Sequence, residues 1–310
     1  MISEIKYANH DEWLAIRHQY IGGSEAGAVI GMNPYKSAYT LWAEKTDKIP
    51  QFEGNLTTEV GAYLEDMVAQ LFERETGKKV RRKNATMVND LYPFACANVD
   101  RMVVGEKALL EIKTTNSIPI MRQCRGTEFP EAYYCQVVHY MAVTGLDKAY
   151  LAVLINCRDF KVFELQRDQA EIDALMRAEE EFWGYVQSGK EPPVDGTDST
   201  SETLQTLYPN SDGSDISLDM YLSAFEIYND VSRQIKELTG IKDQQANLIK
   251  AYMGEAERGH CGDFKVTYGN QNRKSLDTDK LKKDHPEINL DDYYKYSTSR
   301  VFKITKKENK

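Results

Sequence analysis

The period of the hydrophobic pattern changes once along the chain, and this change most limits the folds open to it. Apolar residues recur at helical spacing over 60–76. The segments 92–104 and 108–114 instead alternate as strands, joined by a turn at 105–107. Helical and strand patterns then follow one another as far as residue 187. This order predicts an α/β or α+β fold in which helices cover a mixed central sheet.

The other elements of this region are shorter. Helical spacing and end signals predict helices over 11–19, 25–30, 37–47, 131–145 and 168–187. Ser24 is the expected N-cap of the second of these helices. Apolar runs predict two strands, over 148–156 and 160–165.

Composition marks a break after residue 190. Residues 191–216 are rich in Pro, Gly, Ser, Thr and Asp, which is typical of a linker or a mobile loop. We therefore expect one domain over 1–190 and a mostly helical extension over 217–310.

Within the extension, the pattern over 217–255 predicts a helical hairpin or a long helix bent at Gly240. Residues 263–268 and 299–305 are expected to pair as strands around a short helix at 277–283. Such a region is more typical of an interaction or oligomerisation element than of a second active site.

The net charge of −9, from 39 basic and 48 acidic residues, discourages non-specific adhesion to nucleic acid. A DNA-directed protein with this balance must concentrate its positive charge locally. The sequence has one basic cluster, Lys78-Lys79-Val80-Arg81-Arg82-Lys83. A DNA contact and a solvated loop are equally open interpretations of it.

The five cysteines are scattered and contain no CxxC pair, which argues against a disulfide scaffold, a zinc ribbon or a four-cysteine iron–sulfur cluster. We expect reduced thiols that are buried as small apolar residues. The chain has no run of about 18 apolar residues, and its start does not resemble a signal peptide. We therefore expect a cytoplasmic protein without membrane contact.

Two carboxylates and a lysine stand at the predicted hairpin. Along a strand side chains alternate, so Glu111 and Lys113 point to one face while Leu110 and Ile112 point to the other. The turn brings Asp100 towards Glu111, and converging carboxylates repel unless a cation lies between them. Mg²⁺ takes oxygen ligands, and a lysine beside it can position a water or accept its proton. This set suits metal-assisted phosphodiester hydrolysis, although the pattern alone is weak.

Residues on other elements add to this set. Glu65 lies at the edge of the apolar face of the 60–76 helix, and Gln136 lies on a polar stripe with His139 and Tyr140. We do not assign His139 a catalytic role. The Gly-Gly-Ser turn at Ser24 offers an anion site, with Arg17 shortly upstream, although a plain N-cap also accounts for Ser24.

Five motifs in order resemble the phage lambda exonuclease and YqaJ-type viral recombinase family, within the PD-(D/E)XK nuclease fold. They are Trp13…Arg17…Gly23-Ser24-Glu25, "GAYLEDMVAQLFERETG", "ANVDRMV", "LLEIKT" and "CQVVHYMAVTG". The resemblance covers roughly residues 10–190. Val99 stands where the classical motif has proline before the aspartate.

The resemblance implies a 5′-to-3′ exonuclease on double-stranded DNA ends that releases 5′-mononucleotides. Asp100, Glu111 and the carbonyl of Ile112 would ligate Mg²⁺, with Mn²⁺ also possible, and Lys113 would serve the attacking water. Glu65 and Gln136 would support the metal and the water. Arg17 and Ser24 would hold the 5′-phosphate.

The family further implies a homo-oligomeric ring, a trimer or tetramer around DNA, and a single-strand annealing protein as partner. The setting would be recombination by a phage or prophage in a bacterial host. Two other functions remain open. One is a structure-selective endonuclease or resolvase of the same fold, and the other is a catalytically silent DNA-end-binding accessory protein.

Overall fold

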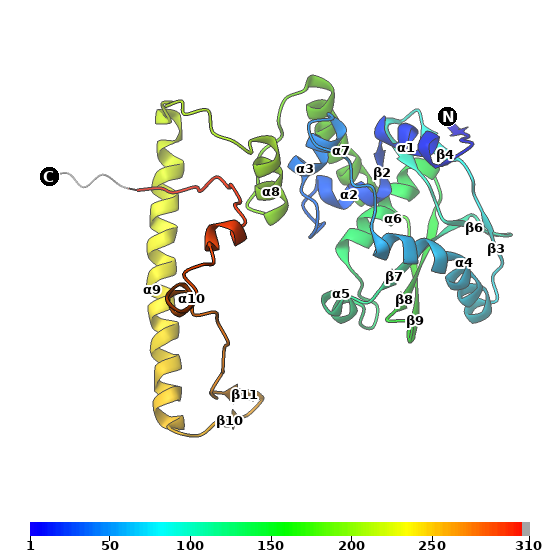
Figure 1. The fold of residues 1–310 in the computed structure, drawn as a ribbon. Coiled ribbons are helices and arrows are strands. Elements are labelled where there is room, and N and C mark those ends of the chain that lie inside the picture. The colour runs from blue at the N-terminus through cyan, green and yellow to red at the C-terminus, as the bar shows by residue number, and fades with distance from the viewer. Residues whose placement is uncertain (306–310) are drawn as a thin grey trace. The chain divides into compact units, whose positions relative to one another are not determined.

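The computed structural model describes residues 1–305 and shows two compact units (Figure 1). The first unit spans Met1–Tyr208, and the second begins at Pro209. The extension expected over 217–310 therefore includes residues 306–310, which lie outside the described residues. Across residues 1–305, no helix has both the length and the apolar character that crossing a bilayer requires.

Two sheets form the framework of the first unit. The larger sheet has the order β3-β6-β7-β8-β9 and the smaller one the order β1-β4-β5-β2. In the larger sheet β7 and β8 run parallel, and the other neighbours are antiparallel. Its strands are Val80–Arg82, Arg101–Val103, Ala108–Thr115, Lys148–Ile155 and Asp159–Gln166. The smaller sheet contains Ile2–Ile5 (β1), Thr86–Asn89 (β4), Tyr92–Ala97 (β5) and Ile21–Gly22 (β2).

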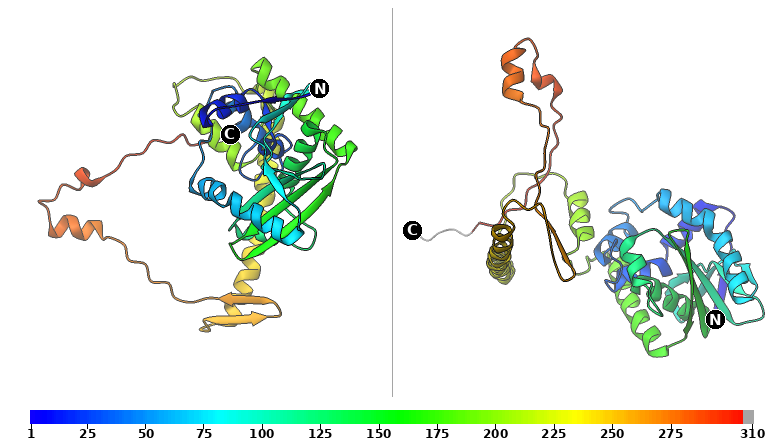
Figure 2. Two further views of the ribbon diagram at one scale, coloured as in Figure 1. Left: turned by 90° about the vertical axis from the view of Figure 1, so that its right-hand side faces the viewer. Right: turned by 90° about the horizontal axis from the view of Figure 1, so that it is seen from below.

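Helices cover both faces of the larger sheet (Figure 2). On one face α4 packs its Val68 and Phe72 against Leu110 of β7. On the other face α6 contributes Val137 and Met141 to a larger core that contains Leu109. The helices of this unit are α1 to α8, at His10–His18, Gly23–Val29, Ala38–Lys45, Leu56–Thr76, Ile118–Gln123, Glu131–Thr144, Gln169–Ser188 and Asp198–Leu207. The expected mixed sheet flanked by helices is confirmed.

The strand expected over 92–104 is wrong in one respect, because the structure divides it into β5 and β6. β5 pairs with β4 in the smaller sheet, whereas β6 pairs with β7 in the larger one. Asp100 lies in the short connection between them, and its side chain accepts a hydrogen bond from the backbone N–H of Ile112 on β7. The change of sheet therefore places this carboxylate at the junction of the two sheets.

The segment expected as linker, 191–216, contains helix α8. This helix packs against α3, where Thr40 Oγ1 lies 2.8 Å from Thr203 Oγ1 and Thr200 donates to Ser37 Oγ at 2.8 Å. Both α8 threonines are buried. Hydroxyl pairing holds this helix in place together with Leu204 and Leu207, which pack against the core, and the polar composition of the segment did not indicate it.

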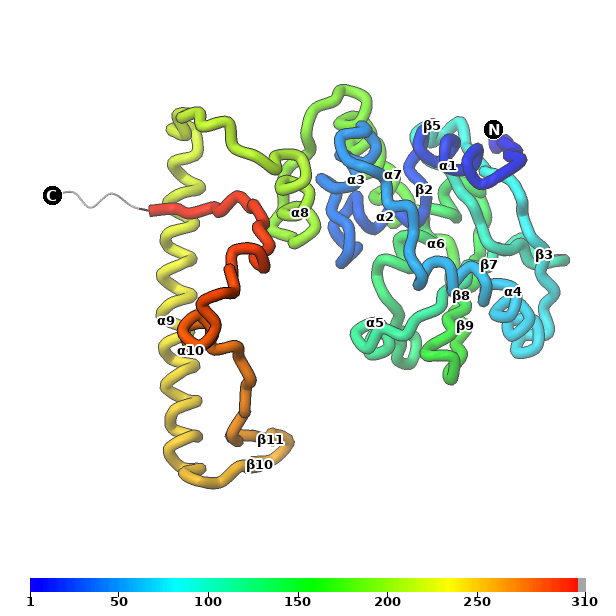
Figure 3. The backbone as a smooth tube through the Cα atoms, viewed as in Figure 1, coloured from blue at the N-terminus to red at the C-terminus, as the bar shows by residue number. Residues whose placement is uncertain are grey.

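The second unit is built on one long helix, α9, at Leu222–Met253 (Figure 3). The expected bend at Gly240 is wrong, because a single glycine costs only about 1 kcal/mol in a helix interior and does not end a long helix. The other elements of this unit are two short 3₁₀ turns, η1 at Asp219–Tyr221 and η2 at Leu290–Tyr293, and α10 at Thr278–Asp284.

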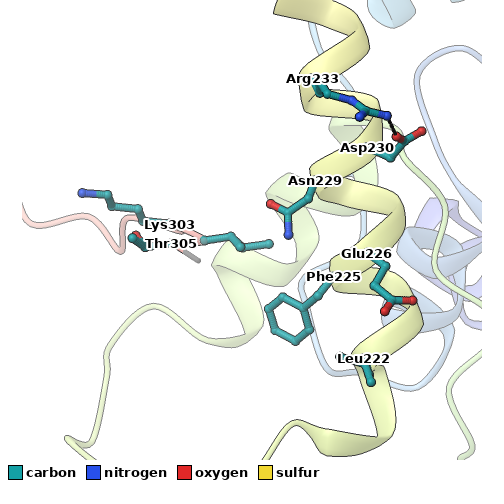
Figure 4. A pocket seen from close by; sticks show the side chains of 9 residues that line it. Leu222, Phe225, Glu226, Asn229, Asp230, Arg233, Lys303 and Thr305 are labelled. Atoms are coloured by element: carbon teal, nitrogen blue, oxygen red, sulfur yellow. Dashed lines mark hydrogen bonds and ion pairs between the residues drawn. The ribbon is translucent and has the colours of Figure 1, made fainter. Parts of the chain in front are cut away.

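The strand pairing expected between 263–268 and 299–305 is also wrong. Phe264–Thr267 (β11) pairs instead with Arg258–Cys261 (β10), across a two-residue turn at Gly262-Asp263. A turn this short favours local pairing. Residues 299–305 form no strand and lie beside α9, where Lys303 and Thr305 face a pocket lined by Phe225 and its neighbours (Figure 4).

The five cysteines are all free thiols. Cys96, Cys124 and Cys135 are buried as expected, and burial raises the pKa of Cys96 to about 12. Cys157 and Cys261 are exposed, so the expectation of burial is wrong for these two. Both stand beside tight turns, where a side chain has little to pack against.

Candidate active site

Strand β7 presents its two faces to different surroundings, as its alternation predicts. Leu110 and Ile112 belong to the apolar cluster under α4. Glu111 faces α6 instead, where Gln136 Nε2 donates to its Oε1 at 2.6 Å. Lys113 lies on the same side and contacts the same oxygen at 2.7 Å. One strand therefore carries a core face and a charged face.

Asp100 reaches this charged face from the junction of the two sheets. Its Oδ2 accepts a hydrogen bond of 2.7 Å from the backbone N–H of Ile112. The β6–β7 register pairs Arg101 with Leu110, so Asp100 lies beside Glu111, as the hairpin predicted. Beyond Leu110, β7 has no paired residue on β6, and the Asp100 carboxylate accepts the Ile112 N–H in its place.

Glu111 is 2% exposed, and its two oxygens differ. Oε1 accepts from both Gln136 and Lys113, whereas Oε2 has no hydrogen-bond partner among the described residues. A buried carboxylate oxygen without a donor is costly. This oxygen is therefore available to a ligand of positive charge.

The two carboxylates perturb each other. Burial and the neighbouring Glu111 raise the pKa of Asp100 well above its ordinary value. Burial also raises the pKa of Glu111, against the opposing effect of Lys113. For Lys113 burial lowers the pKa, but Glu111 and Asp100 outweigh it, so the pKa is raised. Without a metal ion, Lys113 is therefore a cation and a hydrogen-bond donor.

Arg17 and Ser24 contact each other and line the same cleft. Arg17 Nη2 donates to Ser24 Oγ at 2.8 Å, and its guanidinium lies 4.9 Å above the ring centroid of Trp13. The expected N-cap at Ser24 is wrong, because α2 begins at Gly23, two residues earlier than expected, and Gly22 is its N-cap. The Ser24 hydroxyl accepts from Arg17 and keeps its own proton to donate.

The eight residues proposed from the sequence all line one cleft of about 400 Å³ in the first unit. They are Arg17, Ser24, Glu65, Asp100, Glu111, Ile112, Lys113 and Gln136. Gly61 and Thr58 of α4 and Asn98 complete the wall opposite α6.

A sequence model of the YqaJ-like viral recombinase domain matches residues 12–147. The chain is 38% identical over 287 residues to the uncharacterized protein YqaJ of Bacillus subtilis, covering 90% of this chain and 89% of that protein. The chain belongs to the YqaJ family. Protein D345L of African swine fever virus is 35% identical over 63 residues, which is 20% of this chain and 18% of the viral protein.

Solved structures agree with the YqaJ assignment at the level of fold. An alkaline exonuclease from Laribacter hongkongensis superposes with a TM-score of 0.50 at 19% identity, covering 58% of this chain and 94% of the exonuclease. The same enzyme in complex with dAMP superposes with a TM-score of 0.51 at 19% identity and the same coverage. The PD-(D/E)XK-like fold and the family drawn from the five motifs are confirmed.

Glu65 of this YqaJ-family protein lines the cleft, but its carboxylate is held in an ion pair. Its carboxylate pairs with the guanidinium of Arg101, which also contacts Asp66 at 2.7 Å. Arg101 is 3% exposed. Glu65 still raises the pKa of Asp100 through its charge. Its role in supporting a metal or a water stays a prediction.

Some residues that build the YqaJ-family cleft were missed from the sequence. Lys45 is buried and donates to the carbonyls of Arg17 and Tyr20 at 2.9 and 2.7 Å, and it pairs with Glu25 at 2.9 Å. These contacts fix the end of α1 against the start of α2. A lone lysine near a helix end carries no signal of such a role in the sequence. Arg101 could have been proposed from the sequence, because it directly follows the candidate ligand Asp100.

Carboxylates pair with most of the positive charge of the basic cluster at 78–83. Four of its five cations are paired with carboxylates, through Lys78–Glu106, Lys79–Glu73, Arg82–Asp66 and Lys83–Glu4. The two interpretations, a DNA contact and a solvated loop, both stay predictions. The cluster contributes to folding contacts between β3, α4 and β1.

The donor set can accept a hard divalent cation. In the described part of the chain, no three His, Cys, Asp or Glu side chains converge closely enough to hold a metal ion by themselves. Asp100 and the unpartnered oxygen of Glu111 supply two carboxylates, and Ile112 supplies the nearby backbone. Mg²⁺ typically binds through one or two carboxylates and keeps several waters, which this set fits.

Gly23 makes a close approach that a side chain would disturb. A Cβ there would lie 2.4 Å from Cε1 of Tyr140, whose hydroxyl accepts from Gln136 at 3.0 Å. We expect Gly23→Ala to destabilise the protein by about 2 kcal/mol through overpacking and to displace Tyr140. Thermal unfolding measures this loss. Gly184→Ala in α7, which has no atom within 4 Å of the added Cβ, is the matched control and should not destabilise.

Proposed function

We propose that this protein is a metal-dependent exonuclease that degrades linear double-stranded DNA from the 5′ end. Membership of the YqaJ family and a fold shared with an alkaline exonuclease support a nuclease. The observation that carries the proposal is the pairing of Asp100 with a buried Glu111 whose Oε2 lacks a donor in the described chain. Such a pair is stable as two anions only when a cation joins it.

The proposed metal is Mg²⁺ or Mn²⁺, held by Asp100, Glu111 and the carbonyl of Ile112. When bound, such an ion polarises a phosphoryl oxygen and lowers the pKa of a bound water. Gln136 orients Glu111 by donating to its Oε1. Lys113, kept cationic by the two carboxylates, donates to the attacking water or to a phosphate oxygen and offsets the charge that develops there.

Arg17 and Ser24, which line the same cleft, support the proposed 5′-to-3′ polarity. Arg17 and the Ser24 hydroxyl offer one charged and one neutral donor to a terminal phosphate. The guanidinium is held against Trp13 and by the Lys45 contacts to its own backbone. A 5′-phosphate bound there leaves the next phosphodiester to face Asp100 and Glu111. A homo-oligomeric ring and a single-strand annealing partner belong to the same proposal, supported by the family.

The assay compares linear duplexes that carry a label at either end, with and without a 5′-phosphate, in Mg²⁺ and in EDTA. We expect mononucleotides from the 5′ end in Mg²⁺, none in EDTA, and faster cleavage of phosphorylated ends. Arg17→Ala should remove most of the preference for the 5′-phosphate. Arg177→Ala, on the exposed side of α7, is the control and should keep it.

Other outcomes would identify the alternatives. Cleavage of circular or branched DNA with intact linear ends would indicate an endonuclease or resolvase of the same fold. Tight binding to ends without any cleavage in either metal would indicate an accessory protein and contradict the proposal.

A further inference from the structure

A second groove opens from the catalytic cleft and has a different character. It has a volume of about 910 Å³ and shares Ser24, Lys113 and Gln136 with the cleft. Away from these polar residues its lining is mostly apolar and aromatic. The apolar lining consists of Met32, Pro34, Tyr35, Pro119, Ile120, Phe129, Pro130 and Tyr133.

Two tyrosines, Tyr35 and Tyr133, line this groove. The ring centroid of Tyr133 lies 5.5 Å from Lys113 Nζ. Tyr35 stands on the connection between α2 and α3 and is 70% exposed. The connection is ordered, because Asn33 Oδ1 accepts from the backbone N–H of Tyr35 at 2.8 Å and of Lys36 at 3.2 Å. An exposed aromatic ring on a fixed loop is a stacking surface.

The charges of the groove exclude a phosphodiester backbone. Its lining includes Glu128 and Glu131, which repel phosphate, whereas its cationic residue is Lys113, which it shares with the catalytic cleft. A flat, uncharged, aromatic group fits this lining. The ligand that combines such a group with a phosphate beside Lys113 is a nucleotide.

Resting on the proposed function, we infer that this groove binds the base of the terminal nucleotide of the strand being cut, by stacking on Tyr35. That nucleotide lies between the phosphate held by Arg17 and Ser24 and the phosphate that faces Asp100 and Glu111. Because Ser24 and Lys113 both line the groove, the base between them faces into it. Stacking recognises every base by its ring face, so the subsite favours a base without selecting a sequence.

The test uses 5′-phosphorylated duplexes that differ only in the first nucleotide, which is either normal or abasic, and measures kcat/KM for its release. We expect the wild type to cut the abasic end about tenfold more slowly, which is the size of one stacking contact. Tyr35→Ala should lower kcat/KM about tenfold on the normal end and leave the abasic end unchanged. Tyr35→Phe should behave as the wild type.

Tyr63→Ala is the matched control, since Tyr63 is 83% exposed on α4 and lies outside the groove. It should leave the ratio of the two rates unchanged. Equal rates on both ends in the wild type would overturn the inference while leaving the exonuclease intact, and so would an equal loss on both ends in Tyr35→Ala. Absence of cleavage at every end would overturn the proposed function and the inference with it.

Discussion

Asp100→Asn is expected to abolish DNA cleavage while making the folded protein more stable at neutral pH. The amide keeps an oxygen that can accept from the Ile112 N–H, so the junction of β5 and β6 is preserved. It removes one of the two carboxylates among the three proposed metal ligands, and we expect a loss of activity of at least about a hundredfold. It also removes a buried negative charge that stands beside Glu111.

The stability gain has a defined pH dependence. The pKa of Asp100 is raised in the folded state, so the folded protein binds more protons than the unfolded chain as pH rises above the ordinary aspartate value. In the wild type this costs stability increasingly from about pH 4 up to the raised folded pKa. Thermal unfolding in EDTA at pH 4 and pH 7 should therefore show a gain for Asp100→Asn at pH 7 only.

A metal titration completes the experiment. Mg²⁺ should raise the unfolding temperature of the wild type and not that of Asp100→Asn, because a ligand stabilises only the state that binds it. Asp173→Asn, on the exposed side of α7, should match the wild type in all three measurements. A variant that keeps its activity, or that responds to Mg²⁺ as the wild type does, would refute the assignment of Asp100.

Glu179→Ala is expected to destabilise the protein by about 3 kcal/mol, the lower end for breaking a buried ion pair. Glu179 Oε1 lies 2.8 Å from Nδ1 of His139, and both side chains are fully buried. The other ring nitrogen, Nε2, lies 2.9 Å from the carbonyl oxygen of Cys96 on β5. His139 thus joins α6, α7 and the smaller sheet. It plays a structural part here, which agrees with leaving it out of the catalytic set.

The pKa of His139 is also raised, but by an attractive partner rather than by burial and repulsion. Burial lowers the pKa of His139, but Glu179 outweighs it and the pKa is raised above 6.5. The pair therefore contributes its full stability below about pH 6.5 and loses it as pH rises through the folded pKa. Denaturant unfolding should show the largest loss for Glu179→Ala near pH 6 and a smaller one at high pH.

The neighbouring residue provides the control. Glu180 is exposed on α7, and Glu180→Ala should change stability by less than about 0.5 kcal/mol at any pH. A loss in Glu179→Ala that does not vary with pH would show that His139 is neutral in the folded protein and that only packing was lost.

Much of the site could be predicted because its signals are local. The alternation of Leu110, Glu111, Ile112 and Lys113 defines both faces of β7 without further information. The helical spacing of α6 predicts where Gln136 faces once the strand is placed. For this reason the eight cleft residues could be proposed from periodicity and motif order.

The rest depended on contacts between distant segments. The sequence around Asn98 reads as one continuous strand, and only the pairing of β5 with β4 and of β6 with β7 divides it. Hydroxyl groups contribute to holding helix α8, and a segment rich in such residues is expected to be a linker when composition alone is considered. The second groove needs the loop at Tyr35 and the segment before α6 to meet, and no periodicity predicts that meeting.

The two-faced character of β7 also limits how this family can vary in length. Exchanging a residue on either face changes one contact, but inserting a single residue within β7 between Ala108 and Glu111 would exchange the faces themselves. The carboxylate would then point into the apolar layer under α4, and Leu110 would point into the cleft. We therefore expect this strand to tolerate substitutions, whereas a change in its length must keep Glu111 and Lys113 on the cleft face.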